Sequence, residues 1–108
     1  MNEYPDNIPV GWEELVEHMK QELLQTAQVV AADYLSIYYK EKWGALDVNL
    51  FFDTDEFYDA LSKVIAKYRE RSKITCAVCG AAATMKDLSG WMMPLCEDCE
   101  EGMKNGNA

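Results

Sequence analysis

The chain has 108 residues, of which 49 % are apolar and 27 % charged, a globular composition that excludes a disordered chain. Its formal net charge of −9, from 19 acidic and 10 basic residues, opposes binding to the phosphate backbone of a nucleic acid. No stretch approaches the roughly 18 apolar residues of a transmembrane helix, and the acidic, polar start does not resemble a secretory signal. We therefore expect a cytoplasmic protein that does not enter a membrane.

The first 28 residues predict an extended arm followed by an amphipathic helix. Two prolines, Pro5 and Pro9, disfavour regular structure over residues 1–10, which we expect to form an extended N-terminal arm. Glu13 and Glu14 then suit the first turn of a helix, where negative charge complements the helix dipole. Between residues 12 and 28 apolar side chains recur at helical spacing, at Trp12, Leu15, Met19, Leu23 and Ala27. This spacing predicts a helix with one buried face.

The middle of the chain predicts a β-hairpin and a second helix. Apolar and polar residues alternate over 35–40 and again over 46–52, and the connection between these runs contains Gly44. Such alternation around a glycine-containing turn is typical of an antiparallel hairpin. Asp53 and Asp55 are capping candidates for a helix that ends at about Ser72. Its expected buried face consists of Phe57, Leu61, Val64, Ile65 and Tyr68. We therefore predict an α+β fold in which residues 11–73 form a helix–β-hairpin–helix core.

Four cysteines form the most specific pattern in the sequence. They make two Cys-x-x-Cys pairs with 16 residues between the pairs: Cys76 and Cys79, then Cys96 and Cys99. This spacing is typical of structural zinc sites, in which two knuckles place four thiolates around one tetrahedral ion. In the cytoplasm a metal is favoured over disulfides, and two pairs at this separation disfavour a redox-active Cys-x-x-Cys. Iron in a tetrahedral thiolate site is the alternative to zinc.

Residues 74–103 predict a zinc ribbon. The segment has few large apolar residues and cannot build a core of its own, whereas structural zinc contributes about 10–16 kcal/mol in small peptide modules. Two short runs around Ser89 and Gly90, at 84–88 and 91–93, predict a hairpin between the knuckles. Because all four ligands are sulfur, we expect a closed, structural site rather than a catalytic one. Residues 104–108 are expected to form a flexible tail.

Several short motifs, in their joint order, add a family resemblance. They are Gly11-Trp12, Tyr39-Lys40-Glu41-Lys42-Trp43-Gly44-Ala45-Leu46, Arg71-Ser72, Thr75-Cys76-x-x-Cys79-Gly80, Gly90-Trp91 and Leu95-Cys96-x-x-Cys99. Over about residues 11–100 the chain resembles a group of small uncharacterised proteins of bacteria, phages and prophages. That group usually carries histidine at the last ligand position, where this chain has Cys99, a difference that keeps four ligands. The resemblance implies no established activity, only a context in mobile elements and hence a bacterial cell or a phage-infected host.

Candidate partner-binding residues fall in the hairpin turn and in the ribbon. They are Lys40, Lys42 and Trp43 in the turn, and Trp91, Met92 and Met93 in the ribbon. The turn residues suit a recognition loop, because tryptophan is common at interface hot spots; the alternative is solvated charges and a tryptophan folded onto the core. The ribbon residues suit an apolar contact surface; the alternative is that they cover the ribbon against the helical body.

No catalytic motif is visible, so we expect a protein that is not an enzyme. The leading hypothesis is a small accessory protein of a phage or mobile element that binds a protein partner. Its acidity suits a basic, nucleic-acid-binding surface on the target, as an inhibitor of host defence requires. The alternative is a nucleic-acid-binding or transcription-regulatory zinc ribbon. Lys63, Lys67 and Arg71, which share one helix face, are its phosphate-binding candidates; the alternative, a solvated helix face that balances the acidic surface around it, is favoured.

Overall fold

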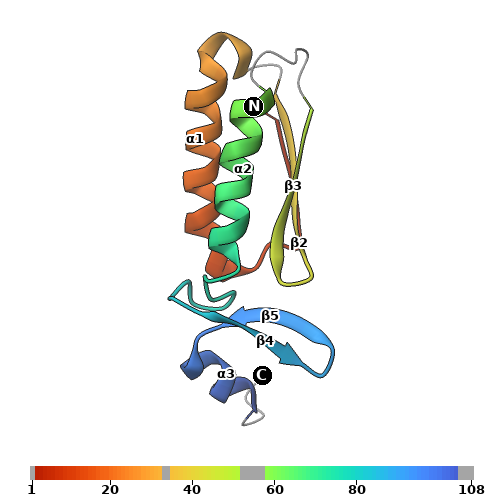
Figure 1. The fold of residues 1–108 in the computed structure, drawn as a ribbon, viewed down its shortest axis with the longest axis vertical. Helices are drawn as coiled ribbons and strands as arrows, with labels where there is room; N and C mark the ends of the chain where they lie inside the picture. Colours follow the sequence, from red (N-terminus) through yellow and green to blue (C-terminus); the bar gives the residue numbers. More distant parts are fainter. Residues whose placement is uncertain (1, 33–34, 52–57, 105–108) are drawn as a thin grey trace.

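The computed structural model describes residues 2–32, 35–51 and 58–104 and has the predicted α+β fold (Figure 1). In chain order its elements are β1 (Asn2–Asp6), the 3-10 helix η1 (Val10–Trp12), α1 (Glu13–Ala32), β2 (Ser36–Lys42), β3 (Ala45–Phe51), α2 (Tyr58–Ser72), β4 (Thr84–Leu88), β5 (Trp91–Leu95) and α3 (Glu97–Lys104). The sheet β1-β2-β3 and the two long helices form the body of an elongated molecule. The hairpin β4-β5 and α3 lie at one end of this body.

Helices α1 and α2 lie side by side across one face of the three-stranded sheet (Figure 1). Strands β2 and β3 form the expected antiparallel hairpin, and Trp43 and Gly44, both at positive φ, form its two-residue turn. Inward side chains of the sheet meet the apolar faces of both helices. The buried core consists of Trp12, Val16, Met19, Leu23, Ala27, Leu35, Ile37, Tyr39, Leu46, Leu61, Val64 and Tyr68. Most of the predicted buried faces are thereby confirmed, although Leu15 and Ile65 are only partly buried.

The N-terminal segment differs from the expected arm, because Asn2–Asp6 joins the sheet as β1. It runs parallel to β2 at the edge of the sheet, and the Asn2 N–H donates to the Leu35 carbonyl (2.9 Å). An edge strand tolerates the proline in this segment, since one side of such a strand needs no partner. The Glu3 carboxylate accepts a hydrogen bond from Lys20 of α1 (2.7 Å), which lowers the pKa of Glu3. The sheet therefore has three strands where the sequence predicted two.

The element boundaries agree with the sequence at one helix end and differ at another. Helix α2 ends at Ser72 as predicted, whereas α1 continues to Ala32 rather than ending near residue 28. The extra turn contains neither glycine nor proline, so nothing in it stops a helix. The capping candidates Asp53 and Asp55, and Phe57 of the expected buried face, lie outside the described residues.

Ser72 joins the end of α2 to the hairpin, and its loss has a predictable cost. Its buried Oγ donates to the Arg69 carbonyl (2.6 Å) and accepts from the Leu46 backbone N–H (2.9 Å). Ser72→Ala leaves that buried N–H without an acceptor, so we expect the free energy of unfolding to fall by about 1–3 kcal/mol. Urea denaturation measures the loss, with Ser62→Ala at a partly exposed position of α2 as the control. Equal stability of the two variants would contradict this account of Ser72.

Candidate metal centre

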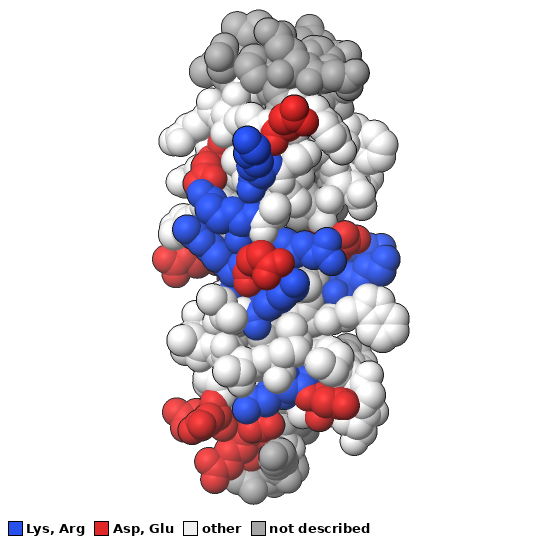
Figure 2. Space-filling model, in the orientation of Figure 1, with Lys and Arg blue, Asp and Glu red and all other residues white. Residues whose placement is uncertain are grey.

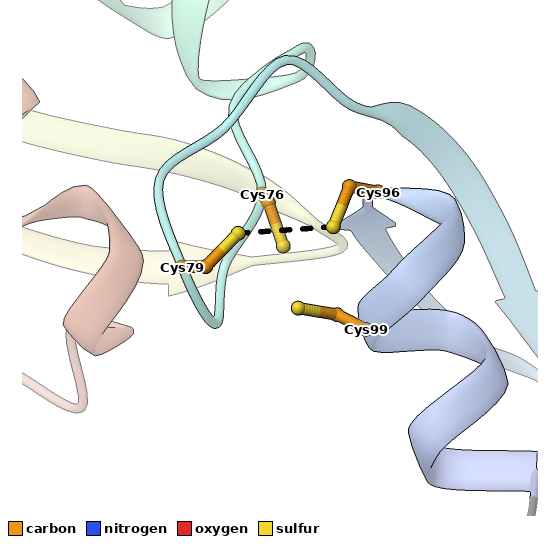
Figure 3. Close-up of side chains that lie close together, drawn as sticks. All are labelled: Cys76, Cys79, Cys96 and Cys99. Carbon is orange, nitrogen blue, oxygen red and sulfur yellow. Dashed lines mark hydrogen bonds between the residues drawn. The ribbon is translucent and has the colours of Figure 1, made fainter.

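The four cysteines meet where the loop after α2 approaches the start of α3. Cys76 and Cys79 lie in the loop after α2, Cys96 directly precedes α3, and Cys99 lies in the first turn of α3. Their side chains point toward one another (Figure 3), and the four sulfur atoms all lie within 4.8 Å of one another. The predicted clustering of the two Cys-x-x-Cys pairs is therefore confirmed.

The donor set fits a tetrahedral metal ion. With metal–sulfur bonds of about 2.3 Å, a regular tetrahedron places its sulfurs about 3.8 Å apart, and the Cys79 and Cys96 Sγ atoms are 3.7 Å apart. A disulfide requires about 2.05 Å, and all four cysteines are free thiols. Cys76, Cys79, Cys96 and Cys99 can therefore bind one metal ion, and four thiolates leave it no open position for a substrate.

Backbone N–H groups prepare Cys76 to act as a ligand. Burial raises the pKa of its thiol, but the backbone N–H groups of Cys79, Cys96 and Val78 outweigh burial and lower the pKa to about 6. At Cys79 the Ala81 N–H lowers the pKa, whereas hydrogen bonds with neighbouring thiols raise it by more. Hydrogen bonding with the Cys96 thiol likewise raises the pKa of Cys99. The Cys76 thiolate therefore forms readily, whereas the thiols of Cys79 and Cys99 keep their protons until a cation displaces them.

Metal binding near pH 7.5 is expected to release at least two protons, one each from Cys79 and Cys99. Their raised pKa values keep both thiols protonated, and a thiol must lose its proton to bind a metal. Cys76 adds to this release only as the pH falls toward about 6, so the affinity for Zn²⁺ should decrease as the pH falls. Calorimetric titration of metal-free protein with Zn²⁺, in buffers of different ionisation enthalpy, counts the protons. Binding with no proton release would contradict the expectation.

The first cysteine knuckle is held against the start of α1. The Gly11 N–H donates to the Ala77 carbonyl (2.8 Å), and the indole N–H of the fully buried Trp12 donates to the Thr75 carbonyl (3.0 Å). A Cβ on Gly11 would lie only 2.1 Å from the Cys76 carbonyl oxygen, so this approach of two backbones requires glycine. The Gly11-Trp12 motif therefore joins the helical body to the metal centre.

The turn between β2 and β3 makes a second contact with the ribbon. A Cβ on Gly44 would lie 2.7 Å from Met85 Sδ and 2.9 Å from the Met92 carbonyl oxygen. Beside this contact is a groove of about 390 Å³, lined by Glu41, Trp43, Ser89, Gly90, Trp91 and Met92. Trp43 is 75 % exposed and Trp91 62 % exposed. Trp43 therefore does not fold onto the core, and Trp91 does not cover the ribbon against the body, whereas Met92 and Met93 are half-buried and the Met92 backbone meets the turn.

Three of the six predicted partner-binding residues do not line this groove. Lys40 and Lys42 are exposed on the sheet face that the helices leave open, and Met93 is half-buried in the ribbon hairpin. The groove also contains Glu41, which belongs to the predicted recognition loop over residues 40–44. Its place within the Lys-Glu-Lys-Trp-Gly turn is the sequence signal that points to it.

Charge is segregated on the face of the molecule shown in Figure 2. Lysine and arginine gather across the middle of this face, and acidic residues gather at the end that carries the ribbon. Exposed basic residues of the hairpin and α2 are Lys40, Lys42, Lys63, Lys67, Arg69 and Arg71. Helix α3 carries Glu97, Asp98, Glu100 and Glu101. A chain of net charge −9 therefore also has a basic surface.

None of the described helices is long and apolar enough to cross a membrane. No protein-family model, curated protein or solved structure matches the chain. The resemblance to small proteins of bacteria, phages and prophages therefore stays a prediction.

Proposed function

We propose that the chain is a non-enzymatic accessory protein of a phage or mobile element, which binds one structural Zn²⁺ and acts by protein–protein interaction in the cytoplasm. The observation that carries the proposal is the pair of exposed tryptophans, Trp43 and Trp91, beside one groove. Tryptophan is enriched among the residues that dominate the binding energy of protein interfaces. Two such side chains, contributed by different parts of the fold, are best explained as a contact surface.

Zinc is the ion that the four thiolates favour. Soft sulfur ligands in a tetrahedral arrangement select zinc or iron over magnesium, calcium and manganese. A closed set of four ligands supports a structural role rather than a hydrolytic one. Metal analysis of protein expressed with both zinc and iron in the medium tests the choice. We expect one zinc per chain and a colourless protein; visible thiolate-to-iron absorption would favour iron.

The partner that we propose is a basic, nucleic-acid-binding host protein, which the chain inhibits by covering its binding surface. Support comes from the net charge of −9 and from the acidic residues gathered on α3 at the ribbon end (Figure 2). Opposite charge steers two proteins together and favours the correct partner. A host-defence or nucleic-acid-handling protein has the required positive surface.

Affinity capture from host lysate tests this function. Zinc-loaded protein is immobilised, and the lysate is treated with nuclease before elution. We expect one stoichiometric protein that survives nuclease treatment and dissociates as salt is raised, because charge contributes to its binding. Recovery of nucleic acid, with all captured proteins lost on nuclease treatment, would contradict protein–protein interaction.

Nucleic-acid binding is the second candidate, and the basic surface over α2 in Figure 2 favours it. Lys63, Lys67 and Arg71 lie exposed on this helix at a spacing that places them on one face. If they bind phosphate, the affinity for labelled DNA or RNA falls steeply as salt is raised. Lys63→Ala should then reduce the slope of log affinity against log salt concentration by about one. Absence of binding at low salt in fluorescence anisotropy would end this candidate.

A further inference from the structure

Two similar β-turns line the groove between the hairpin turn and the ribbon, one on each side. Trp43 and Gly44 form the turn of one wall, and Ser89 and Gly90 form the turn of the other. A carboxylate closes each turn: the Gly44 N–H donates to Glu41 Oε2 (2.9 Å), and the Gly90 N–H donates to Asp87 Oδ1 (2.7 Å). Because both turns are closed by hydrogen bonds and one packs on the ribbon, the two tryptophans are carried on fixed backbone. Ligand binding therefore costs little conformational entropy, because this backbone is already ordered.

The chemistry of the lining suits a cation on an apolar stem. Trp43 and Trp91 expose aromatic surface, and tryptophan is the best aromatic partner for a guanidinium group. Glu41 Oε1 has no hydrogen-bond or ion-pair partner among the described residues, so a charge is available in the groove. Met92 adds an apolar lining on which methylene groups can pack. The volume of about 390 Å³ lies within the usual range of small ligand sites, about 300–1,000 Å³.

We propose that this groove binds an arginine side chain of a basic protein partner. The guanidinium stacks on Trp43 and Trp91 and pairs with Glu41, and its methylene stem contacts Met92. Arginine is preferred over lysine because its planar group stacks on aromatic rings and is more weakly hydrated. The net charge of −9 draws basic partners toward the protein. This inference rests on the proposed protein-binding function and specifies the residue that the partner supplies.

The test is an NMR titration of the zinc-loaded, ¹⁵N-labelled chain with a peptide of nine arginines. The chain has three tryptophans, and each gives one indole N–H signal. We expect the signals of Trp43 and Trp91 to shift, while that of Trp12 stays fixed, because its indole is buried and bonded to the Thr75 carbonyl. A peptide of nine lysines should bind at least threefold more weakly.

Variants distinguish binding of the peptide in the groove from its nonspecific electrostatic attraction to an acidic protein. Glu41→Gln keeps an oxygen for the Gly44 N–H but removes the negative charge. It should lower the affinity for the arginine peptide about three- to tenfold. Trp43→Leu and Trp91→Leu should each lower the affinity for the arginine peptide about two- to fivefold. Phe51→Leu, at a 61 % exposed aromatic residue that does not line the groove, is the matched control and should bind normally.

The proposal would be overturned if neither groove tryptophan shifts, or if the two peptides bind equally and Glu41→Gln has no effect. These outcomes are independent of the lysate capture that tests the proposed function. A protein captured equally well by the wild type and by the Trp43→Leu, Trp91→Leu double variant would leave protein binding standing and overturn the arginine groove. Peptide shifts without any captured protein would support the groove and count against the function.

Discussion

Replacing Cys76 with Ser is expected to unfold the C-terminal ribbon and to leave the helix–sheet body folded. All buried residues of the main core belong to residues 12–68, so the body has a core of its own. Over residues 74–103 the described residues that are buried are few: Cys76, Ala77, Pro94 and Leu95. A segment with so small a core is expected to depend on a bound metal, which contributes about 10–16 kcal/mol in small zinc modules.

Three measurements follow the outcome of Cys76→Ser. Zinc content should fall well below one per chain, amide signals of residues 74–104 should lose their dispersion, and most of the helical circular dichroism should remain. Val78→Ser is the matched control, because Val78 is exposed in the same knuckle and is not a ligand. Unchanged thermal stability with full zinc content in Cys76→Ser would show that this thiol does not hold the metal.

Gly11→Ala is expected to cost about 3 kcal/mol or more, although it adds a single methyl group. The new Cβ would lie 2.1 Å from the Cys76 carbonyl oxygen and 2.6 Å from the Ala77 carbonyl carbon. Both are backbone atoms, so the knuckle must move away from α1. Overpacking of this kind costs about 1–3 kcal/mol, and separation also weakens the hydrogen bonds to Ala77 and Thr75, at about 0.5–1.5 kcal/mol each.

Chemical denaturation of the zinc-loaded protein measures the effect of Gly11→Ala. Gly102→Ala is the matched control: it lies in helix α3, and an added Cβ there meets nothing within 4 Å. Alanine is the better helix former, so the control should be neutral or slightly stabilising. We expect Gly11→Ala also to change the fluorescence of Trp12, whose buried indole bonds to the displaced loop. Equal stability of the two alanine variants would contradict the close docking of the knuckle.

Local patterns in the sequence identified the four clustered cysteines and most of the core. A Cys-x-x-Cys pair must turn back on itself to place both thiols on one ion, so its spacing specifies geometry directly. Helical and alternating periods likewise report which side chains share a face, as with Met19 and Leu23 in α1 or Ile37 in β2. These features depend on residues close together along the chain.

The features that sequence reasoning did not find depend on contacts between distant segments. The strand β1 pairs with β2 in parallel, more than 30 residues along the chain, and no local pattern encodes that register. The contact of Gly11 with the Cys76 knuckle joins segments still farther apart. The exposure of Trp43 depends on where the hairpin turn meets the ribbon, which its own sequence does not state. The position of Glu41 in the groove likewise depends on where the hairpin turn meets the ribbon.

Native mass spectrometry of the full chain, purified without added metal, is the most direct test of the four-cysteine metal centre. We expect one zinc ion per chain, as proposed, and four cysteines that resist alkylation by iodoacetamide until a chelator removes the ion. After chelation all four should react, and Zn²⁺ should restore their protection. A metal-free chain whose cysteines react at once, or one that contains disulfides, would contradict the metal centre and the ribbon built around it.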